Sequence, residues 1–379
     1  MPKICFVVNT LVFFNSHRLP LAVEAVKKGY DVHIITNLDS EKAEQFTEFT
    51  YHHVGFTRSG QNPFVELLSL LRLVFLLRKI KPSLVHLVTI KPVLYGGIAA
   101  RLSGVDAVVA AISGLGSVFS AKEGFGLIRL RVVRHLYQIA LNHKKLAVIF
   151  QNVDDRDKLL STKAVHLDNT FMVRGSGVCL SDYPFLPEPS QVPIVSMAAR
   201  LLKEKGVCEF VDAARILKER GISIQMQVIG SPDLGNPSSV TEKAISDWQD
   251  ENIVHFLGFR KDISSLYSQS NIVCLPSYYG EGLPKSLIEA AACGRAVITT
   301  DMPGCRDAIT PSVTGLLIPP RDAVALADAI QILIENPSRR HEMAKAGREL
   351  AEEVFTIENV VRQHFGIYDE LLSSVDIAL

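Results

Sequence analysis

Residues 272–299, IVCLPSYYGEGLPKSLIEAAACGRAVIT, hold the pattern that decides the fold. An apolar run, Ile272–Leu275, precedes a glycine-rich turn, and a helix-like segment over Leu283–Cys293 leads to a second apolar run, Ala296–Thr299. Short apolar runs joined by a helix are typical of parallel strands in a sheet that helices cover on both faces. The stretch therefore predicts a strand–helix–strand unit.

The same alternation extends toward both ends of the chain. Further predicted strands are Ile4–Val8, Asp31–Thr36, Leu84–Val88, Ala107–Ile112, Leu146–Phe150, Pro193–Met197, Ile224–Ile229 and Ile253–Leu257. The segment Leu180–Pro193 interrupts the alternation, and its four prolines predict a stiff, extended linker.

A chain of 379 residues is long for a single core. We therefore predict an α/β protein of two doubly wound, Rossmann-like domains, over residues 1–185 and 186–355. A C-terminal helix over 356–379 is expected to return to the first domain. Since ligands of such sheets bind at the carboxyl ends of the strands, we expect the active site in a cleft between the domains.

The two halves of the chain differ in charge, although the total is zero. Residues 1–185 hold 22 Lys and Arg against 14 Asp and Glu, and the remainder holds 18 against 26. The basic half is expected to face an anionic partner. The six cysteines form no Cys-x-x-Cys pair, so we expect reduced thiols and no zinc site.

The turn before the predicted helix 283–293 has the features of an anion site. Pro284 lies near the first helical position, and the free N–H groups of a first helical turn, together with the helix dipole, suit a diphosphate. Glu281 and Glu289 are too far apart for one metal-binding pair. They suit hydrogen bonds to hydroxyl groups at two ends of a ligand, although acidic residues near a helix start also need no ligand to explain them.

A second basic segment follows the strand 193–197. Arg200 and Lys205 stand five residues apart before Gly206, and such a loop can clamp two phosphates or simply lie in solvent.

These two segments resemble the motifs of glycosyltransferase family 4. Residues 281–289 are similar to its Glu-x7-Glu motif, and residues 199–206 to its Gly-Arg-Leu-x-x-x-Lys-Gly signature, with Ala199 in place of glycine. The resemblance implies a GT-B fold, with a nucleotide-sugar-binding second domain and an acceptor-binding first domain. It implies catalytic roles for Glu281, Arg200 and Lys205, the last two stabilising the departing diphosphate. The donor-binding residues that it implies are Glu289, Gly282, Leu283, Lys285, Ser286, Gly230, Phe259 and Arg260.

The first domain departs from the broad family. Many members carry a His-Gly where this chain reads Ser113-Gly114-Leu115, which resembles a bacterial subgroup that adds N-acetylhexosamines or related sugars to undecaprenyl-diphosphate-linked acceptors. The resemblance assigns Ser113, Gly114 and Leu115 to the donor, and leaves open which residue replaces the histidine. His17 and Arg18 are candidate acceptor ligands or, equally, a solvated pair at a helix start. For His86 we expect a packed core histidine.

Two further patterns have simpler interpretations. Asp155-Arg-Asp157 matches a manganese motif of the other main glycosyltransferase fold, but acidic residues in a first helical turn need no metal. The chain has no phosphate-binding loop ending in Gly-Lys-Ser/Thr, which argues against an ATPase.

Two basic, amphipathic helices are predicted in the first half, over about 66–81 and 127–145. Residues 66–145 hold 12 Lys and Arg against 3 Asp and Glu. Such helices lie on anionic membranes or pack in a core with solvated arginines. We expect a cytoplasmic protein, peripheral on the inner face of the cell membrane, since the N-terminus lacks the layout of a signal peptide and no apolar stretch is long enough to span.

The resemblance thus implies a retaining, metal-independent transferase that moves a hexose or N-acetylhexosamine from a UDP-sugar to a lipid-diphosphate-linked saccharide. It needs no cofactor, and no nucleic acid is expected as a partner. Alternatives are a sugar-nucleotide epimerase of the same fold, a transferase with a soluble acceptor, and an inactive sugar-nucleotide-binding protein. The sugar, the acceptor, the linkage and the choice between UDP and GDP stay open.

Overall fold

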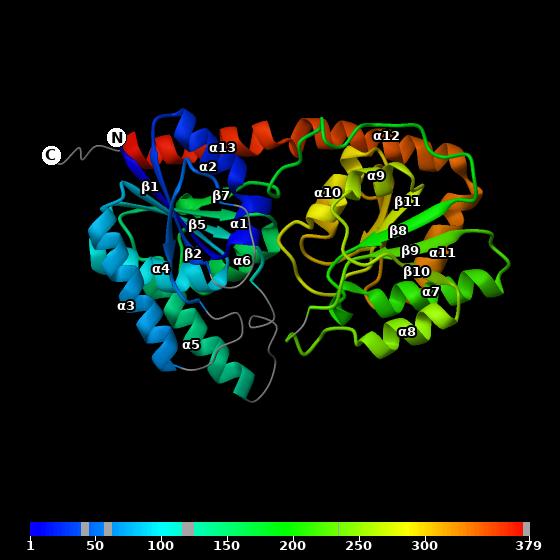
Figure 1. Ribbon diagram of the computed structural model, residues 1–379, viewed down its shortest axis with the longest axis horizontal. Helices are drawn as coiled ribbons and strands as arrows, with labels where there is room; N and C mark the ends of the chain where they lie inside the picture. The colour runs from blue at the N-terminus through cyan, green and yellow to red at the C-terminus, as the bar shows by residue number, and fades with distance from the viewer. Residues whose placement is uncertain (39–44, 57–62, 116–124, 234, 374–379) are drawn as a thin grey trace. The chain divides into compact units, whose positions relative to one another are not determined.

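The protein forms two compact units in the computed structural model, which describes residues 1–38, 45–56, 63–115, 125–233 and 235–373. Unit 1 comprises Met1–Ser176 together with Ile357–Leu379, and unit 2 comprises Gly177–Thr356 (Figure 1). The C-terminal segment therefore belongs with the N-terminal unit. The unit boundary lies nine residues before the predicted position, 185/186.

Unit 1 is built, within the described residues, on a seven-stranded parallel sheet. Its strands are β1 (Lys3–Thr10), β2 (Asp31–Asn37), β3 (Thr50–His53), β4 (Leu84–Val88), β5 (Ala107–Ile112), β6 (Lys145–Phe150) and β7 (Thr170–Met172). Their order is β3-β2-β1-β4-β5-β6-β7. The direction of strand addition therefore reverses between β1 and β4, and ligands of doubly wound sheets bind at the carboxyl edge near such a reversal.

Helices cover both faces of this sheet (Figure 1). They are α1 (Leu11–His17), α2 (Leu19–Lys27), α3 (Pro63–Ile80), α4 (Ile90–Ser103), α5 (Phe125–Ala140), α6 (Val153–Ser161) and α13 (Ile357–Ser373). Alternate residues of β1 enter different cores: Cys5 and Val7 pack with α3, α4 and α5, whereas Ile4 and Phe6 pack with α1, α2 and α13. The predicted basic helix 127–145 ends at Ala140, because Lys145 already pairs in β6.

Helix α13 is held to unit 1 by a buried polar contact. The Tyr368 hydroxyl is hydrogen-bonded to Nδ1 of His86 on β4, and His86 has no solvent exposure. Burial lowers the pKa of His86 well below its usual value, so the ring is neutral. The expectation of a packed core histidine is confirmed.

Unit 2 repeats the architecture with a six-stranded parallel sheet in its described residues. The strands are β8 (Ile194–Ala198), β9 (Gln225–Ile229), β10 (Val254–Phe256), β11 (Ile272–Leu275), β12 (Ala296–Thr300) and β13 (Gly315–Ile318). They are ordered β10-β9-β8-β11-β12-β13, with the reversal between β8 and β11. The helices are α7 (Val207–Glu219), α8 (Glu242–Asp250), α9 (Ile263–Ser268), α10 (Lys285–Ala292), α11 (Ala323–Glu335) and α12 (Pro337–Val354).

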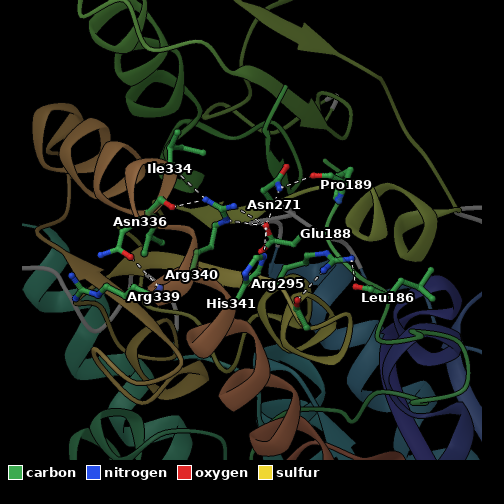
Figure 2. A network of polar contacts seen from close by, with 12 residues as sticks. Leu186, Glu188, Pro189, Asn271, Arg295, Ile334, Asn336, Arg339, Arg340 and His341 are labelled. Atoms are coloured by element: carbon green, nitrogen blue, oxygen red, sulfur yellow. Dashed lines mark hydrogen bonds and ion pairs between the residues drawn. The ribbon is translucent and has the colours of Figure 1, made fainter. Parts of the chain in front are cut away.

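The predicted linker 180–193 is extended, but it is bound to unit 2. Glu188 is paired with Arg340 of α12 at 2.9 Å and accepts a hydrogen bond from Asn271 at 2.9 Å (Figure 2). Arg295, which is 1% exposed, donates to the carbonyl oxygen of Leu186 at 2.9 Å. Because these contacts bury charged groups that have well-defined partners, the segment is a fixed strap of unit 2. We refer to residues 180–193 as the strap.

Candidate active site

The reversal point of the unit 2 sheet brings together the two segments that the sequence singles out. Residues 199–206 follow β8, and residues 276–284 follow β11, its neighbour in the sheet. The backbone N–H of Tyr278 donates to the carbonyl oxygen of Glu204 at 3.0 Å, and the Ser277 hydroxyl donates to the same oxygen at 3.0 Å. Gly206 has a φ of +83°, and a Cβ there would lie 2.2 Å from the carbonyl oxygen of Pro276. Only glycine permits this close approach.

Lys205 and Glu281 meet at this point. The Lys205 ammonium lies 2.5 Å from Oε2 of Glu281, and the two side chains are 17% and 13% exposed. A half-buried cation held by one carboxylate can turn toward a phosphate, while the carboxylate accepts from a sugar hydroxyl. The structure therefore brings together two of the three predicted catalytic residues.

Helix α10 begins beside this pair. Pro284 stands immediately before its first residue, Lys285, so the helix starts two residues later than predicted. The N–H groups of its first turn point toward the carboxyl edge, as an anion site requires. Gly282 and Leu283 are buried in the turn before it, and Ser286 lies in its first turn.

Glu289 lies one turn into α10 and is only 8% exposed. Its Oε1 accepts a hydrogen bond from the Tyr183 hydroxyl at 2.7 Å and lies 3.6 Å from the Lys285 ammonium. Burial raises the pKa of Glu289, and the charge of Lys285 and the Tyr183 hydrogen bond oppose that rise. Glu281 and Glu289 thus have separate partners, Lys205 for the first and Tyr183 with Lys285 for the second. Tyr183 was missed because nothing in the sequence pairs the linker with α10.

The remaining predicted donor residues line the same edge. Arg200 is exposed and forms an ion pair with Asp233 at 2.5 Å, so it does not share the Lys205–Glu281 contact. Gly230 follows β9, and a Cβ there would lie 1.8 Å from the carbonyl oxygen of Ala199. Its N–H donates to the carbonyl oxygen of Gly258, next to the exposed Phe259 and to Arg260. Arg260 is paired with Asp262 at 2.5 Å.

Two family models match the chain, one in each unit. Residues 183–350 match the glycosyl transferases group 1 model, and residues 3–152 match the glycosyl transferase 4-like model. Together they cover every strand of the two sheets except β7. The chain is a glycosyltransferase.

Curated relatives of this glycosyltransferase point to the same class. It is 35% identical over 184 residues to the N,N'-diacetylbacillosaminyl-diphospho-undecaprenol alpha-1,3-N-acetylgalactosaminyltransferase of Campylobacter jejuni, and this match covers 48% of the chain and 46% of that protein. It is 26% identical over 368 residues to CapM of Staphylococcus aureus, a capsular polysaccharide biosynthesis glycosyltransferase, with 91% of each chain covered.

Solved structures confirm that the glycosyltransferase has the GT-B fold. Sucrose-phosphate synthase from Thermosynechococcus elongatus superposes with a TM-score of 0.81 at 20% identity, over 99% of this chain and 100% of the other. HepE of Anabaena in complex with UDP superposes with a TM-score of 0.74 at 19% identity, over 98% and 100%.

The reversal point of the unit 1 sheet carries a row of polar side chains. Ser113, Gly114 and Leu115 follow β5, where Gly114 has a φ of +104°. Buried oxygens of Ser113, of Asn9 at the end of β1 and of Thr89 after β4 find no hydrogen-bond partner among the described residues. Thr89 also has a φ of +74°, which a β-branched residue adopts only under strain. Asn9 and Thr89 are candidate ligand contacts that the sequence analysis missed; their position directly after apolar strands was the available signal.

The two acceptor-side candidates differ in exposure. His17 ends α1, where it stacks on Phe13 and contacts the Ser16 hydroxyl at 2.6 Å. Arg18 is 2% exposed, and burial lowers its pKa to about 10. Arg18 is therefore no solvated residue at a helix start.

The Asp155–Asp157 motif has the geometry of a helix N-terminus. Asn152 caps α6, and its side chain also donates to Asp155 at 3.1 Å, whereas Asp157 is exposed and paired with Arg156 at 2.9 Å. Burial raises the pKa of Asp155. Across the described parts of the chain, no group of three or more His, Cys, Asp or Glu residues is arranged to hold a metal ion.

Gly304→Ala is expected to reduce glycosyl transfer about a hundredfold. A Cβ at Gly304 would lie 2.1 Å from the carbonyl oxygen of Gly282, so the turn that carries Glu281 must move. Gly221→Ala is the matched control, because Gly221 also has a positive φ but nothing within 4 Å of its Cβ position. Steady-state kinetics of both variants test this, and equal losses would contradict it.

Proposed function

We propose that the glycosyltransferase is a retaining enzyme that transfers a hexose or N-acetylhexosamine from a UDP-sugar to a lipid-diphosphate-linked saccharide in bacterial surface polysaccharide assembly. The observation that carries this proposal is the meeting of Lys205 and Glu281 beside the start of α10, at the reversal point of the unit 2 sheet. A cation, a row of N–H groups and a carboxylate at one sheet edge suit a diphosphate that is joined to a sugar.

The proposed reaction proceeds on the face of the sugar that the diphosphate leaves. The acceptor hydroxyl oxygen bonds to the anomeric carbon, the bond from that carbon to the diphosphate oxygen breaks, and a diphosphate oxygen takes the hydroxyl proton. Lys205, Arg200 and the first turn of α10 stabilise the charge that develops on the diphosphate, while Glu281 orients the sugar. Glu289 accepts from a hydroxyl of the ribose.

Two related proteins and one structural neighbour support the choice of substrates. HepE of Anabaena was solved with UDP and with UDP-glucose, which favours a uridine donor. The Campylobacter jejuni relative acts on an undecaprenyl-diphosphate-linked sugar, and CapM serves capsule biosynthesis, which together favour a lipid-linked acceptor. No metal or cofactor is required in this proposal, because Lys205 and α10 supply the positive charge that a metal provides in other transferases.

A product assay tests the proposed function. The protein is incubated with a panel of UDP- and GDP-sugars and a polyprenyl-diphosphate-linked saccharide, with and without EDTA. We expect one UDP-sugar to give an elongated, α-configured product at an EDTA-independent rate, with anomeric configuration read by NMR. Epimerised donor in the absence of acceptor, or an inverted product, would contradict the proposal.

The proposed lipid acceptor is accompanied by a surface suited to a membrane. Helix α3 exposes an apolar stripe at helical spacing: Phe64, Leu67, Leu68, Leu71 and Phe75 are 48–81% exposed. Arg72, Arg78 and Lys79 of the same helix are also exposed. On α5, Arg131, Arg134 and His135 are exposed, while Tyr137 is buried.

An apolar stripe with basic neighbours supports docking on the anionic, cytoplasmic face of a membrane. Among the described helices, none combines the length and the apolarity needed to cross a bilayer.

The double variant Leu71→Ser/Phe75→Ser is expected to bind vesicles containing phosphatidylglycerol about tenfold more weakly, since two large side chains no longer enter the lipid. Vesicle flotation at low salt measures this. Val324→Ser, at an apolar residue of unit 2 that is 54% exposed, is the control and should float like the wild type. Equal flotation of all three proteins would rule out α3 as the docking surface.

A further inference from the structure

The strap carries a tyrosine that reaches the candidate donor site. The Tyr183 hydroxyl donates to Oε1 of Glu289 at 2.7 Å, across 106 positions of sequence. Both contacts of the Glu289 carboxylate within the described residues, from Tyr183 and from Lys285, are made by Oε1. This arrangement leaves Oε2 to accept from a ligand hydroxyl.

Tyr183 is itself held firmly in place. Arg348 of α12 donates to the carbonyl oxygen of Tyr183 at 2.8 Å and to that of Ala292, the last residue of α10, at 2.5 Å. One guanidinium thus ties the strap to the helix that bears Glu289. Further along the strap, the ring of Phe185 packs so closely on Gly294 that a Cβ there would lie 2.2 Å away. The position of Tyr183 is therefore set by the hydrogen bond to its own carbonyl oxygen and by the packing of Phe185 two residues later.

The surroundings of Glu289 show why such a donor matters. Burial favours the uncharged carboxyl, and only the Lys285 charge and the hydrogen bonds from Tyr183 and Lys285 favour the carboxylate. The other titratable groups that face it are Tyr267 of α9 and Cys293, which follows α10; both are neutral at ordinary pH and supply no positive charge. A buried carboxylate with few donors depends strongly on each of them.

We propose that Tyr183 is a positioning residue for the sugar nucleotide, which keeps the Glu289 carboxylate ionised and directs its Oε2 toward a ribose hydroxyl. The strap of unit 2 thereby takes part in donor recognition. This inference rests on the proposed function, in which Glu289 binds the donor ribose.

Titration calorimetry with UDP tests the inference on the full chain. Tyr183→Phe is expected to raise the Kd for UDP about tenfold, because a hydrogen bond to a charged group is lost. Tyr267→Phe is the matched control: its buried hydroxyl lies in the same neighbourhood but has no hydrogen-bond partner among the described residues. The control should bind UDP like the wild type.

The pH dependence of UDP binding separates positioning from a general loss of structure. Binding weakens as pH falls through the pKa of Glu289, since a protonated carboxyl accepts less well. Removing the Tyr183 hydroxyl withdraws a contact that lowers this pKa, so the acid limb of the Tyr183→Phe profile should move to higher pH. A merely loosened strap would weaken binding equally at all pH values.

The outcomes distinguish this inference from the proposed function. Failure of the wild type to bind UDP would overturn the proposed donor site and the inference with it. Tight binding by the wild type, with Tyr183→Phe and Tyr267→Phe indistinguishable from it, would overturn the inference alone. An unshifted acid limb with a raised Kd would also overturn it.

Discussion

Lys205→Ala is expected to slow sugar transfer by two to three orders of magnitude, ~100- to 1,000-fold, while leaving the protein folded. The Lys205 ammonium lies 2.5 Å from Glu281 at the edge where the diphosphate is proposed to bind. Removing one positive group that stabilises a transition state costs about a hundred- to a thousandfold in kcat. We expect a loss of this size with the proposed donor, and a similar loss for Glu281→Ala.

Two comparisons keep this prediction specific. Lys243→Ala removes an exposed lysine of α8, 2.9 Å from Asp247, and should leave kcat unchanged. Lys205→Arg keeps the positive charge but places it on a planar guanidinium instead of an ammonium, and this variant should retain more activity than Lys205→Ala. Thermal unfolding of each variant shows whether the fold persists. Near-normal turnover of folded Lys205→Ala would remove Lys205 from the site.

Arg340→Ala is expected to destabilise unit 2 by about 3–5 kcal/mol. Arg340 and Glu188 form an ion pair (Figure 2). Their side chains are 7% and 5% exposed, and Arg340 also donates to the carbonyl oxygen of Leu333 at 2.6 Å. Truncation leaves the buried Glu188 carboxylate without the Arg340 guanidinium, and Nε2 of His341 stays 3.3 Å from its Oε2. Asn271 donates to that carboxylate at 2.9 Å, but an amide does not replace the charge.

Trp248 offers a readout of unit 2 alone. It is the only tryptophan of the chain, and it lies on α8 stacked against Phe256 of β10. Urea unfolding followed by its fluorescence should show a lower midpoint for Arg340→Ala. Arg339→Ala is the control, since the contact of Arg339 with Asn336 uses its backbone N–H and survives the substitution. The double variant Glu188→Leu/Arg340→Met should recover much of the loss, because it removes both charges. An unchanged midpoint for Arg340→Ala would show that the pair contributes little.

Most of the strands that the sequence revealed are buried on both faces, although the partly exposed edge strand β10 was also predicted. Val108 and Val273 lie in uninterrupted apolar runs, which are typical of central strands in a parallel sheet. Strand β3, Thr50–His53, lies at the sheet edge and is polar and partly exposed, so its sequence gave no such signal. Strand β7, Thr170–Met172, is short and half-buried, so it also lacks a clear apolar run.

The candidate site divides in a similar way. Lys205 and Glu281 each lie in a local motif with glycines, which are needed because the backbone passes close to another segment there. The motifs alone therefore indicate that these two residues belong to the site. Contacts between segments that are far apart in the sequence produce no such local motif. The Tyr183–Glu289 hydrogen bond and the Glu188–Arg340 pair join residues 106 and 152 positions apart, and a stretch with four prolines reads as a free linker until its partners are known.

The central claim is that unit 2 holds the diphosphate of a sugar nucleotide between the 200–206 loop and the start of α10. A crystal structure of the full chain with UDP tests it most directly. We predict that the β-phosphate lies within hydrogen-bond distance of the Lys205 ammonium and of backbone N–H groups in the first turn of α10, with a ribose hydroxyl on Glu289. UDP bound at any other edge, with Lys205 still paired only to Glu281, would contradict the account.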